Sequence, residues 1–280
     1  GISIVSAMGG LLFGYDWVVI GGAKPFYERF FEITNSPNLQ GWAMGSALIG
    51  CMVGAIISGG LSDRFGRKKL LILSGGLFLF SAIGTGAANQ MAPFIAYRIL
   101  GGIAIGMAST LSPMYIAEVA PAHVRGKFVS INQLTIVIGI LAAQLANWQI
   151  AQPVVEGASD VEILNSWNGQ TGWRWMFWAE LIPASLFFLL MFIIPESPRW
   201  LAKRGQWDKS KKILAKIGNQ EFVDQAVGEI KETLKDSSKK VNFKALFAPG
   251  MKKILLIGIV LAAFQQWCGI NVKFNYAEEV

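Results

Sequence analysis

Residues 1–22 read GISIVSAMGGLLFGYDWVVIGG, an almost unbroken apolar run that contains one carboxylate, Asp16. A helix rises 1.5 Å per residue, so a run of this length can cross a hydrocarbon core of about 30 Å. An ionisable residue inside a bilayer costs roughly 2.5–3.5 kcal/mol on insertion scales, and such residues are therefore rare and usually functional. The run predicts a membrane-spanning helix that carries a functional carboxylate.

Arg98 is a second ionisable residue in an apolar run, at the head of RILGGIAIGMASTLSP (98–113). An acid and a base in two membrane helices suggest a mutually neutralising pair beside a water-filled path. A proton-coupled carrier needs such a pair. The main alternative is a permanent ion pair with a purely structural role.

The composition is typical of polytopic helical membrane proteins. Of the 280 residues, 53% are hydrophobic and only 15% are charged, against about 45–50% and 25% in soluble domains. We expect an all-α fold with six complete spans and a seventh that begins near residue 252 and is cut off at Val280. Both ends look trimmed, and no signal peptide is recognisable. The six spans are expected at about 1–23, 40–62, 70–88, 92–112, 127–151 and 175–195.

The positive charge is distributed as the positive-inside rule predicts. Segments 63–69, 113–127 and 196–253 hold 20 of the 25 Lys and Arg residues. We therefore expect these segments in the cytoplasm and the protein in the inner or plasma membrane, as a multi-pass protein. The net charge of +7 is a topology signal, and we expect no nucleic-acid partner.

The sequence contains no pattern that indicates catalysis or metal binding. Cys51 and Cys268 both lie in apolar runs, where a disulfide framework is not expected, and His123 is the only histidine. There is no His-Glu-x-x-His motif and no pair of aspartates in facing spans. We expect no enzymatic activity, no metal and no cofactor.

Three domains are expected. Residues 1–195 would form an N-terminal six-helix transmembrane bundle, residues 196–251 a cytoplasmic helical linker, and residues 252–280 the truncated start of a C-terminal bundle. In the linker, Val223, Val227, Ile230 and Leu234 fall on one helical face, and Trp207, Leu214 and Ile217 mark a similar stripe. We expect two short amphipathic helices there.

The first three spans resemble the next three. Asp16 and Arg98 each lie in the first helix of a triplet, beside the glycine pairs Gly9–Gly10 and Gly101–Gly102. Nested repeats of three helices with opposite orientation are an architecture of transporters, with the binding site near the midplane. The alternative is that glycine is simply frequent in membrane helices.

Charged residues recur in the three connections assigned to the cytoplasm. The connections read GGLSDRFGRKK (59–69), PMYIAEVAPAHVRGK (113–127) and PESPRW (195–200). Asp63 is expected to accept hydrogen bonds from helix N-termini. The alternative, isolated surface pairs, would contribute about 0–1 kcal/mol each. We interpret the following residues as a cytoplasmic ionic latch that closes when the carrier faces outward: Asp63, Arg67, Glu118, Arg125, Glu196 and Arg199.

The order and spacing of several motifs resemble the sugar porter family of the major facilitator superfamily. The motifs are GLLFGYD, DRFGRKK, YRILGGIAIG, PMYIAEVAPAHVRGK, NQLTIVIGIL, PESPRWL and QQWCGIN. They cover essentially the whole chain, and the strongest similarity is to bacterial sugar–proton symporters of the xylose type. The resemblance implies a major facilitator-type six-helix bundle built from 3+3 inverted repeats, which works as a monomer when complete.

Candidate sugar-contacting residues can also be identified from their spacing. Phe13 lies three residues before Asp16 and faces the same way. In the fifth span, Gln133, Ile140, Gln144 and Asn147 form a polar stripe broken by one isoleucine. Such a stripe must face other helices or a cavity, and plain interhelical packing is the alternative.

The beginning of the seventh span carries three amides, Gln265, Gln266 and Asn271. They share one face only if the helix breaks, which Gly269 allows. Amide side chains suit sugars because each offers a donor and an acceptor to hydroxyl groups. The resemblance implies that Gln133, Gln265, Gln266 and Asn271 bind sugar hydroxyls and that Phe13 lines the cavity.

The chain departs from the family pattern at three positions. Ile140 stands where the bacterial xylose symporters have a sugar-contacting glutamine, which leaves pentose and hexose open. Asn275 replaces the first tyrosine of a Tyr-Tyr pair, and Lys273 is an ammonium in an apolar span for which we have no physical account.

We expect a carrier that moves a monosaccharide with protons by alternating access. Asp16 carries this expectation, because proton symporters resemble this chain at that position while many facilitative relatives have a neutral residue. The partners would be a small-molecule sugar, protons and the lipid bilayer. A facilitative uniporter and a transport-inactive sugar sensor are the alternatives.

Overall fold

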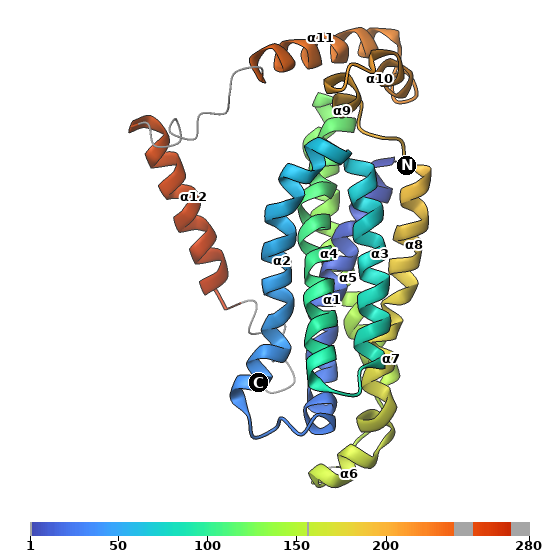
Figure 1. The fold of residues 1–280 in the computed structure, drawn as a ribbon, viewed down its shortest axis with the longest axis vertical. Helices are drawn as coiled ribbons and strands as arrows, with labels where there is room; N and C mark the ends of the chain where they lie inside the picture. The colour runs from blue at the N-terminus through green and yellow to red at the C-terminus, as the bar shows by residue number, and fades with distance from the viewer. Residues whose placement is uncertain (1, 156, 238–248, 270–280) are drawn as a thin grey trace.

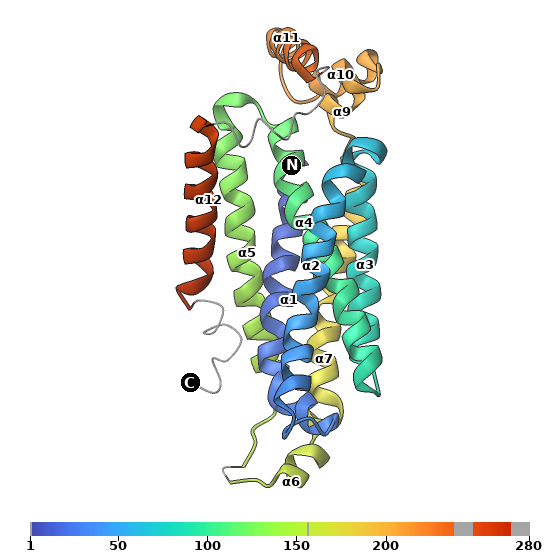
Figure 2. The ribbon, with the colours of Figure 1, turned by 60° about the vertical axis from the view of Figure 1, so that its left-hand side comes forward.

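The computed structural model describes residues 2–155, 157–237 and 249–269. Among these residues, six helices are long and apolar enough to cross a membrane. They lie side by side in an elongated bundle (Figures 1 and 2). The long helices are α1 (Ile2–Phe30), α2 (Pro37–Phe65), α3 (Arg67–Ala87), α4 (Met91–Val119) and α5 (Ala122–Ile150); the sixth span comprises η1 (Asn168–Gly172), α7 (Trp173–Ala179) and α8 (Leu181–Ile193).

Glycine and proline separate the long helices. Gly66 has φ +95°, a conformation that favours glycine, and it allows the abrupt turn from α2 into α3. Pro121 stands between α4 and α5, where its ring cannot continue the preceding helix. These breaks fall where the sequence predicts connections, so the expected all-α membrane bundle is confirmed.

The sixth span differs in its bounds from the span expected at about 175–195. It begins earlier, with the five-residue π-helix η1, and is broken at Glu180, between α7 and α8. Pro183 explains the break, because it has no N–H to donate to the carbonyl of Ala179 four residues before. The interruption lies inside the membrane segment, close to the buried charges described below.

Two helix crossings hold the bundle together through backbone contact. A Cβ atom added to Gly14 or Gly139 would overlap a carbonyl oxygen across the contact between α1 and α5. A Cβ on Gly50 or Gly102 would do the same between α2 and α4. In each crossing, the first helix of one triplet meets the second helix of the other, as two inverted three-helix repeats require.

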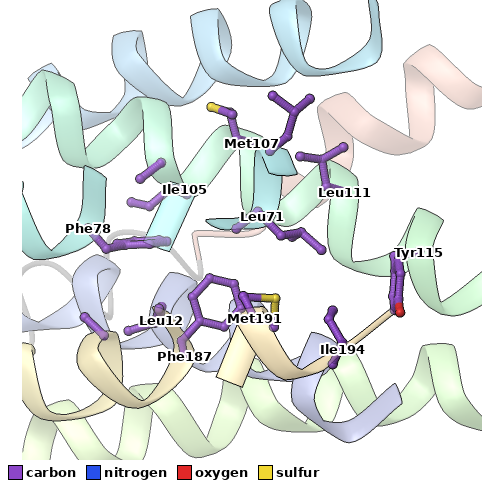
Figure 3. Close-up of a cluster of buried hydrophobic side chains, with 14 of the residues drawn as sticks. Leu12, Leu71, Phe78, Ile105, Met107, Leu111, Tyr115, Phe187, Met191 and Ile194 are labelled. Atoms are coloured by element: carbon purple, nitrogen blue, oxygen red, sulfur yellow. The ribbon is translucent and has the colours of Figure 1, made fainter. Parts of the chain in front are cut away.

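A hydrophobic cluster fills the bundle interior between α1, α3, α4 and α8 (Figure 3). Phe78, Ile105 and Phe187 lie near its centre and are at most 1% exposed. A second cluster, with Tyr27, Phe94 and Trp173, lies nearer the end of α1 and the start of α4. Large apolar side chains also cover the outside of α2 and α5, as expected for surfaces that face lipid or another helix.

Three short helices lie beyond one end of the bundle, which we call the linker end (Figures 1 and 2). They are α9 (Pro198–Lys203), α10 (Trp207–Leu214) and α11 (Gln220–Ser237). Leu214, Val223 and Val227 are buried between α10 and α11. The two amphipathic helices expected from the sequence are therefore present.

At the opposite end of the bundle lie α6 (Asp160–Asn165) and Arg174, whose side chain connects several helices (Figure 1 shows α6). Arg174 donates to the carbonyl oxygens of Gly86 and Ala88, both at 2.8 Å, and so holds the end of α3. Its guanidinium also lies over the rings of Phe30 and Trp173, 4.8 and 4.5 Å from their centroids. One side chain thus joins α1, α3 and the sixth span.

The last described helix, α12 (Pro249–Trp267), stands apart from the bundle in Figure 1. Nearly all of its described side chains are exposed. The expected seventh span starts here, although α12 is not one of the six described helices that meet the criteria for a span. Gly269, with φ +78°, follows it, at the position where the sequence allows a break.

Candidate functional site

Asp16 and Arg98 form a buried ion pair inside the bundle. Nη1 of Arg98 lies 2.6 Å from Oδ1 of Asp16, and the two residues are 2% and 3% exposed. Asp16 comes from α1 and Arg98 from α4, so the pair joins the first helices of the two repeats. Gly101 leaves the space beside Asp16, and the ring of Phe177 lies 5.7 Å from the guanidinium carbon. The pairing expected from the sequence is therefore present.

Glu180 completes this cluster, and sequence reasoning missed it. It is 2% exposed and interacts electrostatically with both Asp16 and Arg98. Its backbone lies at the break between α7 and α8, so the interruption at Pro183 positions a carboxylate in the bundle interior. The signal was available, because Glu180 also lies within an apolar run, MFWAELIPASLFFLL.

The cluster has more acidic than basic groups. Two carboxyl groups face one guanidinium, so with both of them ionised the low-dielectric interior would hold one net negative charge. Within the described part of the chain, Oδ2 of Asp16, Oε1 of Glu180, Nε of Arg98 and the hydroxyl of Tyr15 are buried without a hydrogen-bond partner. Each unsatisfied polar group costs about 1–3 kcal/mol. A single proton on one carboxylate would remove the excess charge and supply a new donor.

The candidate sugar-binding residues of the bundle are distributed unevenly. Phe13 is half-buried, with its ring 6.1 Å from that of Trp17, and Gln133 and Gln144 are exposed. Asn147 is 6% exposed and donates to the carbonyl oxygen of Val19 at 3.2 Å. The polar stripe of α5 is therefore divided. Asn147 belongs to the packing of α5 against α1, whereas Gln133 and Gln144 lie on the exposed surface of α5.

Of the three amides expected in the seventh span, the structure describes only the side chain of Gln265. Gln265 is exposed on α12, whose described side chains are almost all exposed. The side chain of Gln266 lies outside the described residues, as do Asn271, Lys273, Asn275 and Tyr276. The sugar-binding roles expected for Gln265, Gln266 and Asn271 thus stay predictions.

A second charged cluster lies at the linker end, around Arg67. Its side chain is only 9% exposed and lies 2.9 Å from Glu118 Oε1 and 3.2 Å from Asp63 Oδ1. Lys203 of α9 also contacts Asp63, at 2.9 Å. These ion pairs join the α2–α3 connection to the end of α4 and to the linker helices.

The carboxylate at the N-terminus of α3 belongs to Glu196, whereas the sequence suggested Asp63 for such a role. Oε1 of Glu196 accepts hydrogen bonds from the backbone N–H groups of Arg67 at 2.9 Å and Lys68 at 3.1 Å. It also accepts from the N–H of Ser197 at 2.9 Å. A negative charge is favourable where helix N–H groups lack partners inside the helix. Asp63 lies one turn earlier, at the end of α2, and is used in side-chain pairs.

Arg125 and Arg199 are placed differently from the other four residues of the expected latch. Both are exposed, and within the described residues neither forms an ion pair. They line a cavity of about 550 Å³ between the end of α4, the start of α5 and helices α9 to α11. The structure thus joins Asp63, Arg67, Glu118 and Glu196 and leaves two arginines open to a cavity.

Comparisons with known proteins agree with this architecture. The family model described as "Sugar (and other) transporter" matches residues 2–280. The D-xylose–proton symporter of Escherichia coli K12 is 41% identical over 303 residues, covering 100% of this chain and 59% of that protein. The glucose transport protein of Synechocystis is 44% identical over 279 residues, with coverages of 99% and 58%.

A solved structure of a sugar transporter has the same fold. The proton:xylose symporter XylE bound to 6-bromo-6-deoxy-D-glucose, a protein of the major facilitator superfamily, superimposes with a TM-score of 0.86 at 40% identity. The match covers 100% of this chain and 61% of that chain. The chain therefore spans less than two thirds of the length of these relatives.

Proposed function

The chain belongs to the sugar transporter family of the major facilitator superfamily, and on that premise we propose that it is part of a carrier that moves a monosaccharide together with protons by alternating access. The observation that supports proton coupling is the buried cluster of Asp16, Arg98 and Glu180. A carrier that only equilibrates a neutral sugar has no need for titratable groups inside its membrane helices.

The cluster has a simple coupling mechanism. With both carboxylates charged, Arg98 is held by Asp16 at 2.6 Å, and α1 and α4 are tied together. A proton on Asp16 removes this attraction between opposite charges and lets the guanidinium turn towards Glu180. The tie between the two repeats is then weakened, and the bundle is free to change between its outward-facing and inward-facing forms. Because two carboxylates share one base, the proton belongs to the cluster rather than to Asp16 alone.

We assign the sugar site to the face of the bundle that carries Phe13 and Gln133. The exposed amide of Gln133 can donate to and accept from a sugar hydroxyl, and the ring of Phe13 offers an apolar surface to the sugar ring. Gln265, Gln266 and Asn271 would supply contacts from the other side. The substrate class is a pentose or a hexose, in line with the xylose and glucose named for the relatives.

The linker end is assigned to the cytoplasm by the positive-inside rule. Residues 1–195 then form the first membrane bundle, residues 196–251 a cytoplasmic linker, and residues 252–280 the start of a second bundle. Asp63, Arg67, Glu118 and Glu196 would hold the cytoplasmic latch, and Arg125 and Arg199 would join it when the carrier faces outward. The location is the cell membrane, and a monomer suffices for the cycle.

Uptake into proteoliposomes that contain the full-length protein tests this proposal. A panel of pentoses and hexoses is offered with and without an inward proton gradient. We expect the gradient to drive accumulation of one of these sugars and Asp16→Asn to abolish it while exchange down the sugar gradient persists. Uptake that ignores the gradient would identify a uniporter, and binding without any uptake would identify a sensor.

A further inference from the structure

The cavity at the linker end has features of a ligand site that is separate from the proposed sugar site. Its volume of about 550 Å³ falls within the range of roughly 300–1,000 Å³ typical of small-molecule pockets. One wall is the junction of α4 and α5, and the other is formed by the linker helices, chiefly α11. In Figure 2, α11 lies beyond the end of the membrane bundle. A ligand here would bridge the bundle and the linker.

The charged residues that line the cavity are two arginines and two glutamates. Arg125 at the start of α5 and Arg199 of α9 both line it, and no ion pair within the described residues occupies either guanidinium. Glu118 also lines the cavity, but its carboxylate is bound to Arg67 at 2.9 Å. Guanidinium groups bind phosphate oxygens through paired, charge-assisted hydrogen bonds. The two open arginines therefore favour a phosphate group.

The opposite wall offers groups that suit hydroxyls. Gln225, Glu229 and Thr233 follow one another at intervals of four residues, so they share one face of α11, and all three line the cavity. The other face of α11 is buried on α10 through Val223 and Val227. The Thr233 hydroxyl donates to the Glu229 carbonyl oxygen, which leaves its lone pairs free to accept. An amide, a carboxylate and a hydroxyl in a row are the groups that recognise a polyol.

We propose that this cavity binds a phosphorylated sugar, with Arg125 and Arg199 holding the phosphate and the row Gln225–Glu229–Thr233 holding the sugar hydroxyls. Inorganic phosphate would use only the arginines, and an unphosphorylated sugar only the α11 row. A phosphorylated sugar engages both walls and therefore binds more tightly than either.

Binding would regulate the carrier. The ligand fixes α11 to the end of the bundle and occupies the two arginines that the cytoplasmic latch needs, so the return to the outward-facing form slows. A sugar that has been phosphorylated after entry would thereby limit further entry. This regulatory step rests on the proposed function and orientation, whereas the binding site itself does not.

Isothermal titration calorimetry on the full-length protein, in detergent and in phosphatidylcholine nanodiscs, tests the site. Glucose 6-phosphate, glucose and inorganic phosphate serve as separate probes. We expect glucose 6-phosphate to bind at least about tenfold more tightly than phosphate, and Arg125→Ala or Arg199→Ala to weaken it by about tenfold or more, the loss of a charge-assisted hydrogen bond. Thr233→Ala should weaken binding of glucose 6-phosphate and leave that of phosphate unchanged.

Two control variants separate this site from its surroundings. Lys212→Ala removes an exposed positive charge of α10 that does not line the cavity, and affinity should stay unchanged. Gln133→Ala should weaken glucose binding at the transport site and leave glucose 6-phosphate binding intact. That result would stand even if uptake proved independent of protons, so the two proposals fail separately.

Three results would overturn the proposal. Equal affinities for phosphate and glucose 6-phosphate would show that the α11 row recognises nothing. Affinity that survives both arginine variants but is lost in Gln133→Ala would place the ligand in the transport site. Loss of binding when the nanodiscs contain phosphatidylglycerol would assign the arginines to a lipid headgroup instead.

Discussion

Replacing Asp16 by Asn tests the buried cluster most directly, because the side chain keeps its shape and loses only its charge. Breaking a buried ion pair by neutralising one partner costs about 3–5 kcal/mol, since the other charge stays buried. The pair here joins atoms 2.6 Å apart, and both side chains are at most 4% exposed. Glu180 remains to balance Arg98, so we expect the lower end of that range, about 3 kcal/mol of unfolding free energy.

The same variant has a calculable effect on transport. One proton moving through a membrane potential of about 100 mV supplies roughly 2.3 kcal/mol, which corresponds to about 40-fold accumulation of sugar. We expect Asp16→Asn to lose this accumulation and to keep equilibrium exchange. Counterflow with a labelled sugar measures exchange, and steady-state uptake under an imposed gradient measures accumulation.

Asp63→Asn is the matched stability control. Asp63 also forms ion pairs, with Arg67 at 3.2 Å and Lys203 at 2.9 Å, but 52% of its side chain is exposed. Solvent screens such pairs, and we expect a loss of only about 0–1 kcal/mol. If chemical unfolding in detergent shows equal losses for the two variants, burial does not set the strength of the Asp16 pair. If Asp16→Asn still accumulates sugar, the cluster does not couple protons to transport.

Three further predictions concern the bundle and its ends. Gly106→Ala would push a Cβ into the carbonyl oxygen of Cys51 on α2 and should lower the free energy of unfolding by about 1–3 kcal/mol. Gly60→Ala places its Cβ in open space and should be neutral or slightly stabilising. A larger loss of stability for Gly60→Ala than for Gly106→Ala would contradict the packing argument. Arg174→Ala removes four hydrogen bonds and two ring contacts and should lower stability by about 2 kcal/mol. Arg174→Lys should not restore it, because lysine lacks the planar fork. The backbone N–H and the hydroxyl of Ser159 donate to the Glu162 carboxylate and lower its pKa, so the N-terminal cap of α6 is complete above a pH of about 4.3. The cap is lost as the pH falls through the lower pKa of the folded state, and hydrogen exchange of the amides of 160–165 should become faster in that pH range. Unchanged exchange rates would refute the role of Glu162 in the cap.

The spans and the central ion pair could be predicted from the sequence because their signals are local. An apolar run long enough to cross a bilayer is one such signal, and a lone charge within it is another. The same rule identifies Glu180, although no glycine pair or repeat position sets it apart as they do Asp16 and Arg98. Its position at the break between α7 and α8 depends on Pro183, because proline interrupts the hydrogen bonds of a helix.

The direction in which a polar side chain points was harder to predict. Asn147 and Gln144 are three residues apart on α5, yet one donates to Val19 and the other is exposed. The difference arises because Gly22 of α1 leaves room for the Asn147 side chain at that level. Helical periodicity gives the face of a residue, but the neighbouring helix decides whether that face is covered. The same applies to Arg125 and Arg199, because tertiary placement leaves both without an ion pair among the described residues.

The glycine crossings have a mechanical consequence. At the glycines where α1 meets α5 and α2 meets α4, backbone packs directly against backbone, so a change of side-chain rotamer cannot absorb a bend there. Each of these two helix pairs should therefore move as one rigid body. The bundle should deform more easily between α3 and α8, because these helices meet through long side chains such as Phe78, Phe187 and Met191 (Figure 3). A displacement at either membrane surface would therefore be transmitted along these two helix pairs and absorbed by side-chain rearrangement between α3 and α8.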